Sequence, residues 1–265
     1  MPHLHFATLI FLAICAVISG CIDTIAGGGG LISVPALLMV GMPPILSLGT
    51  NKLQATFGSF AASYHFLRTK HISYKEVLWG VIYCSIGASF GTISVFFIHP
   101  EILKRLLPLL LLAVILYMVF KPQAGKLDRH HRMPSHLFFL LFGFSLGFYD
   151  GFFGPGTGSL WAISLVAIMG FNIRKATMHT KVYNFISNII SLIWFIFAGH
   201  IAYTCGLIMA VGQYIGARIG AHLVIHKGTS LIRPLFLSMV SIMTIVVTYK
   251  YYGTDIEHLF NIGTR

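Results

Sequence analysis

Two aspartates and two lysines have the clearest chemical potential in this sequence, because they lie in apolar segments of a chain that is 56% apolar and only 9% charged. Asp23 and Asp150 each precede a glycine by four residues, whereas Lys52 and Lys181 each lie in a polar stretch. The other acidic residues fall in polar loops, a basic linker or the C-terminal tail. Each of the two aspartates could carry a proton or cap the backbone of a broken helix, and charge at such positions usually faces a cavity.

The two lysines have comparable polar neighbours. These are Thr50, Asn51 and Gln54 around Lys52, and Thr180, Asn184 and Asn188 around Lys181. Residues 181, 184 and 188 share one helix face by their spacing, and such a face on an apolar helix predicts the lining of a cavity. The alternative is that each lysine extends from a helix end to the lipid headgroups.

A glycine-rich turn follows each aspartate. The first contains Gly27, Gly28, Gly29 and Gly30, and the second contains Gly154, Gly156 and Thr157. Glycine permits sharp turns and close approach of the backbone to a ligand, and a helix that begins there directs its positive end to the same place. The pattern predicts an anion site, although glycines also allow close helix packing in membranes.

The composition predicts an all-α integral membrane protein. Soluble domains carry about 25% charged residues, and the apolar segments here approach the roughly 20 residues that a membrane-crossing helix needs. The net charge of +11 comes from basic residues scattered over short loops, which favours a role in membrane topology over nucleic-acid binding. The cysteines show no metal-ligand spacing, so we expect no metal and no cofactor.

The sequence contains an internal repeat. "HISY" at 71–74 returns as "HIAY" at 200–203, and "SIGASFG" at 85–91 returns as "YIGARIG" at 214–220. Lys52 matches Lys181 in the same register, and Asp23 matches Asp150 in a register two residues shorter. We predict five apolar segments in each half. In the first half they are 6–26, 31–42, 45–67, 77–98 and 102–120, and in the second half they are 137–153, 159–171, 176–197, 203–225 and 231–249.

The predicted organisation is a first transmembrane repeat at 1–120, a cytoplasmic linker at 121–135, a second repeat at 136–252 and a tail at 253–265. The second segment of each half is too short to cross a membrane and should be a half-helix. The loop that contains His71 is basic and its counterpart at His200 is not, so the positive-inside rule places the two loops on opposite sides. The halves should therefore have inverted topology, with both termini outside.

The motifs "DTIAGGGGLISVPALLMVGMPPILSLGTNKLQATFGS" and "GFYDGFFGPGTGSL…ATMHTKVYNFISN" resemble those of the TauE/SafE sulfite exporter family, and especially its YfcA-like branch. The resemblance covers nearly the whole chain. It implies a carrier in the bacterial inner membrane for sulfite, sulfonates or related anions, driven by an ion gradient such as that of protons.

Broken helices in inverted repeats are typical of secondary transporters with a binding site near the membrane midplane, so we expect alternating access and not enzymatic activity. An anion channel would show the same pattern. An intramembrane aspartyl protease also needs two buried aspartates, but the GxGD sequence of such enzymes is absent. A structural membrane protein would give no reason for matched polar residues. The substrate, the transport direction and the oligomeric state are open at this point.

Overall fold

The computed structural model describes residues 6–68, 72–120, 133–226, 245 and 248–249, and within these ranges the chain is helical with no strand. The first half contains α1 Phe6–Ala26, α2 Gly30–Met39, α3 Pro44–Arg68, α4 Tyr74–Phe96 and α5 Pro100–Phe120. The second half contains α6 Ser135–Phe138, η1 Phe139–Gly143, α7 Phe144–Phe152, α8 Thr157–Ala167, α9 Ile173–Phe197 and α10 Tyr203–His226. The predicted linker up to residue 132, the predicted tail and most of the tenth predicted segment lie outside the described residues.

The predicted class, an all-α membrane protein, is confirmed. In the described ranges α1, α4 and α9 are long and apolar enough to cross a membrane, whereas α2 and α8 are apolar but short. Large apolar side chains are exposed on the outer helix faces, for example Phe60 at 46% and Phe90 at 58%. Water-soluble monomers rarely expose extended apolar surface, so these faces suit contact with lipid.

The helix bounds in the two halves correspond. α3 and α9 each contain 25 residues and begin at Pro44 and Ile173, which are 129 positions apart. α4 and α10 begin at Tyr74 and Tyr203, with the same separation of 129. α2 and α8 begin only 127 positions apart, and α8 is one residue longer than α2. The change of register in the sequence therefore arises in α8 and the loop after it.

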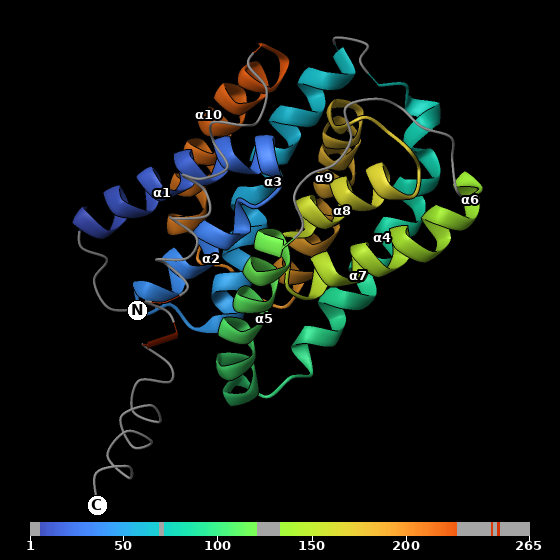
Figure 1. The fold of residues 1–265 in the computed structure, drawn as a ribbon. Helices are drawn as coiled ribbons and strands as arrows, with labels where there is room; N and C mark the ends of the chain where they lie inside the picture. Colours follow the sequence, from blue (N-terminus) through green and yellow to red (C-terminus); the bar gives the residue numbers. More distant parts are fainter. Residues whose placement is uncertain (1–5, 69–71, 121–132, 227–244, 246–247, 250–265) are drawn as a thin grey trace, which may run out of the picture.

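The halves also exchange equivalent contacts. α1 packs on α10 and α4 on α7, while α3 and α9 pack on each other, α10 packs on α3 and α4 packs on α9 (Figure 1). In the described part of the chain each half thus packs its helices against the other half. The division into repeats at 1–120 and 136–252 stays a prediction. The opposite orientation of the two halves across a membrane stays a prediction.

Glycines bring the paired helices into backbone contact. A methyl group on Gly87 or Gly91 of α4 would lie 2.1 or 2.0 Å from the carbonyl oxygen of Phe144 or Phe148 in α7. Gly216 and Gly220 of α10, their repeat partners, face α1 at the same kind of spacing, 2.0 and 2.5 Å from the oxygens of Val17 and Cys21. Small residues at such helix contacts are typical of membrane proteins. The glycines of α4 and α10 thus serve close helix packing.

We predict that Gly91→Ala lowers stability by about 1–3 kcal/mol, the usual cost of overpacking, because α4 and α7 must separate to admit the methyl group. The measurement is the melting temperature of the purified protein in detergent. Ser94→Ala is the control, since the Ser94 hydroxyl bonds only to the Phe90 carbonyl of its own helix. Equal melting temperatures for Gly91→Ala and the wild type would contradict the prediction.

Candidate functional site

The two glycine-rich turns meet at the contact between the halves. Gly27 and Gly154, which are repeat partners, both have positive φ, 74° and 94°, a conformation that favours glycine. The Ser159 amide donates to the Gly27 carbonyl at 3.2 Å, and a methyl group on Gly27 would lie 2.3 Å from the carbonyl carbon of Gly158. The breaks in the two apolar segments are therefore in direct contact.

The two short helices begin at this contact. α2 starts at Gly30 and α8 at Thr157. Several of their first amides donate to the glycine carbonyls of the turns, for example Leu31 to Gly28 and Thr157 to Gly154. Gly30 and Thr157 both line one pocket. This arrangement directs the partial positive charge of two helix N-termini into a single space.

Two buried ion pairs connect the halves reciprocally. Lys52 Nζ lies 2.7 Å from Asp150 Oδ1, and Lys181 Nζ lies 2.9 Å from Asp23 Oδ2. The lysine side chains are 1% and 0% exposed, so the alternative in which they reach the headgroups is wrong. Each ammonium also donates to the backbone carbonyl of its own aspartate partner, at the carboxyl end of α7 or α1.

The two carboxylates have different second partners. Asp23 Oδ1 accepts from the Gly29 amide at 3.2 Å, so Asp23 caps the backbone beyond the break in α1. Asp150 Oδ2 accepts a hydrogen bond from the Ser187 hydroxyl. Asp23 is also more exposed, at 16% of its side chain compared with 4% for Asp150. Backbone capping is thus observed at Asp23, and proton transfer by either carboxylate stays a prediction.

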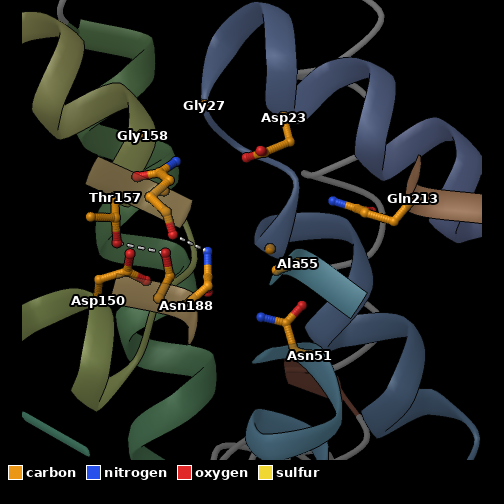
Figure 2. A pocket seen from close by; sticks show the side chains of 13 residues that line it. Asp23, Gly27, Asn51, Ala55, Asp150, Thr157, Gly158, Asn188 and Gln213 are labelled. Carbon is orange, nitrogen blue, oxygen red and sulfur yellow. Dashed lines mark hydrogen bonds between the residues drawn. The ribbon is translucent and has the colours of Figure 1, made fainter. Parts of the chain in front are cut away.

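A polar pocket lies between the two glycine-rich turns and is lined by polar side chains on two opposite sides (Figure 2). Asp23, Asn51 and Gln213 face it from one side, and Asp150, Thr157 and Asn188 face it from the other. The empty space of the pocket is about 360 Å³ when the part open to solvent is included. The volume that the centre of a water molecule can occupy is much smaller, about 20 Å³. That is roughly room for one water, so an oxyanion requires the walls to move apart.

Asn51 presents its amide nitrogen to the pocket (Figure 2). Its oxygen accepts from the Ser33 hydroxyl at 2.6 Å and from the Gln54 amide at 3.0 Å. Because both bonds go to the oxygen, they orient the NH₂ group as a donor toward the pocket. Ser33 and Gln54 thus position Asn51.

Most of the predicted site residues line this pocket. They are Asp23, Gly27, Gly30, Asn51, Asp150, Gly154, Gly156, Thr157, Asn184 and Asn188. The others lie around it: Gly28 and Gly29 in the turn, Gln54 behind Asn51, and Lys52 behind Asp150. Thr180 and Lys181 line a narrow crevice that has no room for a water molecule and shares Gly27 and Gly158 with the pocket. Thr50 accepts from the Ala202 amide just before α10, at 3.0 Å.

Several residues of the site were not predicted. They are Ser33, Ala55, Gly158, Ser187 and Gln213. Gly158 belongs to the second glycine-rich motif and was within reach of the sequence. The repeat gave no signal for Gln213, because its counterpart in the first half is Cys84. Ser187 is recognisable only from its contact with Asp150.

Fold and site together define a multi-pass helical membrane protein with a polar pocket between two halves. A sequence model of the family described as Sulfite exporter TauE/SafE matches residues 12–247, and the chain therefore belongs to this family. The chain is 46% identical to a probable membrane transporter protein of Haemophilus influenzae, over 88% of its own length and 91% of that relative. It is 41% identical to the probable membrane transporter protein YfcA of Escherichia coli K12, over 92% of its own length and 90% of that relative. No solved structure matches this chain.

We predict that Asp150→Asn lowers stability by about 3–5 kcal/mol, because it leaves the buried Lys52 ammonium without its counter-charge. The double variant Lys52→Gln/Asp150→Asn should be more stable than either single variant, since it removes both charges. Thermal unfolding of the four proteins in detergent gives the coupling between the two sites. Glu101→Gln is the control, because the Glu101–Lys104 pair is exposed, and it should leave the melting temperature unchanged. Additive effects of the two substitutions would contradict this prediction.

Proposed function

We propose that this protein is a secondary transporter that moves small anions, such as sulfite, sulfonates or related sulfur-containing anions, by alternating access. The observation that carries the proposal is the convergence of two helix N-termini and two reciprocal lysine–aspartate pairs around one pocket. Secondary transporters use broken helices in this way at the contact between their repeats. The two compared relatives are each named a probable membrane transporter protein.

The pocket favours an anion through its donors. Helix N-termini and amide groups supply hydrogen bonds and partial positive charge without a net charge. Each lysine, by contrast, is neutralised by its aspartate. An anion gains the full attraction of an ammonium only when the partner carboxylate takes up a proton or moves away, which couples anion binding to protonation of Asp23 or Asp150.

Protons suit this site better than sodium as the coupling ion. In sodium-coupled carriers, unwound carbonyls and helix carboxyl ends coordinate the ion. Here the ammonium groups of Lys52 and Lys181 occupy those positions, since each donates to the carbonyl of Asp150 or Asp23. The protein therefore supplies its own cation at both helix breaks.

The site also bears on the two alternatives. A protease with two catalytic aspartates needs carboxyl groups that share one proton, whereas Asp23 and Asp150 are each engaged by a separate lysine. A channel needs a continuous path, and the narrow pocket favours a carrier that must change conformation. Flux that saturates with anion concentration and responds to a gradient would distinguish the carrier from a channel.

We propose the bacterial inner membrane as its location, as for a carrier of this family in the bacteria of the two compared relatives. In the predicted orientation the linker at 121–135 is cytoplasmic and both termini are outside. The partners are then the lipid bilayer, the anion and the coupling proton.

The main test is uptake of radiolabelled sulfite and sulfoacetate into proteoliposomes. We expect Lys52→Gln and Lys181→Gln each to reduce uptake roughly tenfold or more, because losing one hydrogen bond from a charged group costs about 1.5–3 kcal/mol. The double variant Lys52→Gln/Asp150→Asn should fold and still fail to transport. Arg218→Gln is the control, since Arg218 lies on an exposed surface next to Tyr214. Wild-type rates in the folded double variant would remove Lys52 from the site.

A second test concerns the coupling ion. Because the two ammonium groups replace a bound metal cation, uptake should be the same in sodium-containing and sodium-free buffers. A protonophore should abolish accumulation of the anion and leave exchange across equal concentrations intact. Accumulation that requires sodium would exclude the proposed coupling.

A further inference from the structure

Polar side chains on one face of α9 contact Glu76 at one end and Asp150 at the other. His179, Tyr183 and Ser187 follow one another at intervals of four residues and so lie on one helix face. Glu76, in the first turn of α4, stands at the outer end with 47% of its side chain exposed, whereas His179 is fully buried. At the inner end the Ser187 hydroxyl donates to Asp150.

The tautomer of His179 follows from its contacts. Its Nδ1 lies 2.9 Å from the Lys175 carbonyl oxygen, and a carbonyl can only accept, so Nδ1 carries the hydrogen. In the neutral ring, Nε2 is then the basic nitrogen. It faces Glu76 Oε2 at 3.4 Å, which is longer than a good hydrogen bond. His179 therefore presents a proton acceptor to the one exposed acid beside it.

Three ring side chains that pack in a row each carry a buried polar atom. His179 Nε2, Tyr183 Oη and Trp161 Nε1 have no hydrogen-bond partner in the described part of the chain. Their rings pack together, with centroids 4.5 Å apart for Trp161 and Tyr183 and 6.5 Å apart for His179 and Tyr183. Buried polar atoms are nearly always satisfied by protein or by ordered water. Each of these three groups can therefore take part in a further hydrogen bond.

The charged groups around His179 are few. Glu76 faces it from α4, and Lys175 lies one turn before it on α9, with its own Nζ 3.3 Å from Glu76 Oε2. Tyr183 lies one turn further inward, with its ring against Gly80 of α4. Glu76 is thus positioned to attract protons toward the histidine, and Lys175 holds Glu76 in place.

Only the second half carries this line. The repeat counterparts of His179, Tyr183 and Ser187 are Thr50, Gln54 and Gly58, and none of these can exchange a proton at physiological pH. In the predicted orientation the basic loop before α4 is cytoplasmic. The difference between the halves therefore gives Asp150 a route to the cytoplasm that Asp23 lacks.

We propose that Glu76, His179 and Tyr183 form a proton access route from the cytoplasmic face to Asp150. A proton passes from Glu76 to His179 Nε2 and on to the Tyr183 hydroxyl. The Tyr183 hydroxyl releases its own proton inward as it accepts one. The Ser187 hydroxyl, which donates to Asp150, gives its proton to that carboxylate as it receives one in turn. No other bond forms or breaks. This inference rests on the proposed function, because it supplies the coupling proton of that transporter.

The test separates net proton-driven uptake from exchange. Proteoliposomes that contain a pH-sensitive dye are assayed for radiolabelled sulfite uptake under a pH gradient, and for exchange of labelled against unlabelled sulfite at equal pH. For His179→Gln and Tyr183→Phe we expect gradient-driven uptake and dye response to fall roughly tenfold or more, a modest effect for a positioned proton-transfer group. Exchange should stay within about twofold of wild type, since neither residue lines the pocket.

Phe171→Leu is the matched control. Phe171 packs against the His179 ring at 5.0 Å between centroids and lies under the Lys175 ammonium at 4.6 Å. It carries no proton, so the variant disturbs the surroundings of His179 without removing a proton carrier and should keep both activities. Normal gradient-driven uptake in His179→Gln and Tyr183→Phe would overturn the inference and leave the proposed function standing. Loss of exchange in these variants would also overturn it, by giving the residues a structural role. A wild-type protein that neither exchanges nor accumulates anions would overturn the proposed function itself.

Discussion

The structure depends on keeping two ammonium groups and two carboxylates inside an apolar bundle. Removing one partner from a buried pair costs several kcal/mol, so Lys52 and Asp150 must stay together, and so must Lys181 and Asp23. Each pair takes one member from each half. Neither half can satisfy its own charges, and the bond between the halves is therefore electrostatic as well as apolar.

This requirement fixes the geometry of the helix breaks. A lysine ammonium has three hydrogens to place, and here it uses the carboxylate and the backbone carbonyl of the same aspartate. That carbonyl lies near the end of α1 or α7, where helix carbonyls begin to lack intrahelical partners. In α1 it also accepts from the Gly27 amide, at 2.8 Å. The glycines that follow allow the chain to turn back as α2 or α8, and their missing side chains let the two turns touch. Charge pairing, helix termination and close backbone approach thus support one another.

The same arrangement explains why the site could change state. A lysine that is paired with an aspartate attracts an anion only weakly, whereas protonation of the aspartate would free the lysine to bind the anion. The ion pairs that hold the halves together are therefore also the bonds that a proton and an anion would alter. The two pairs are not equivalent. Asp23 is partly exposed and caps the turn at Gly29, whereas Asp150 is enclosed and bonded to Ser187. The ionisable side chains along α9 extend this difference.

The sequence by itself determined the membrane class, the helical segments, the two breaks and the four buried charged residues, because hydropathy, glycine clusters and isolated charges are local signals. The internal match further identified Asp23 with Asp150 and Lys52 with Lys181. Only the tertiary structure decided that the pairs cross between the halves, that Thr50 supports α10 and does not line the pocket, and that Ser33, Ser187 and Gln213 belong to the site. These facts depend on which helix faces meet, and a contact between residues such as Lys52 and Asp150, 98 positions apart, leaves no trace in the spacing of either.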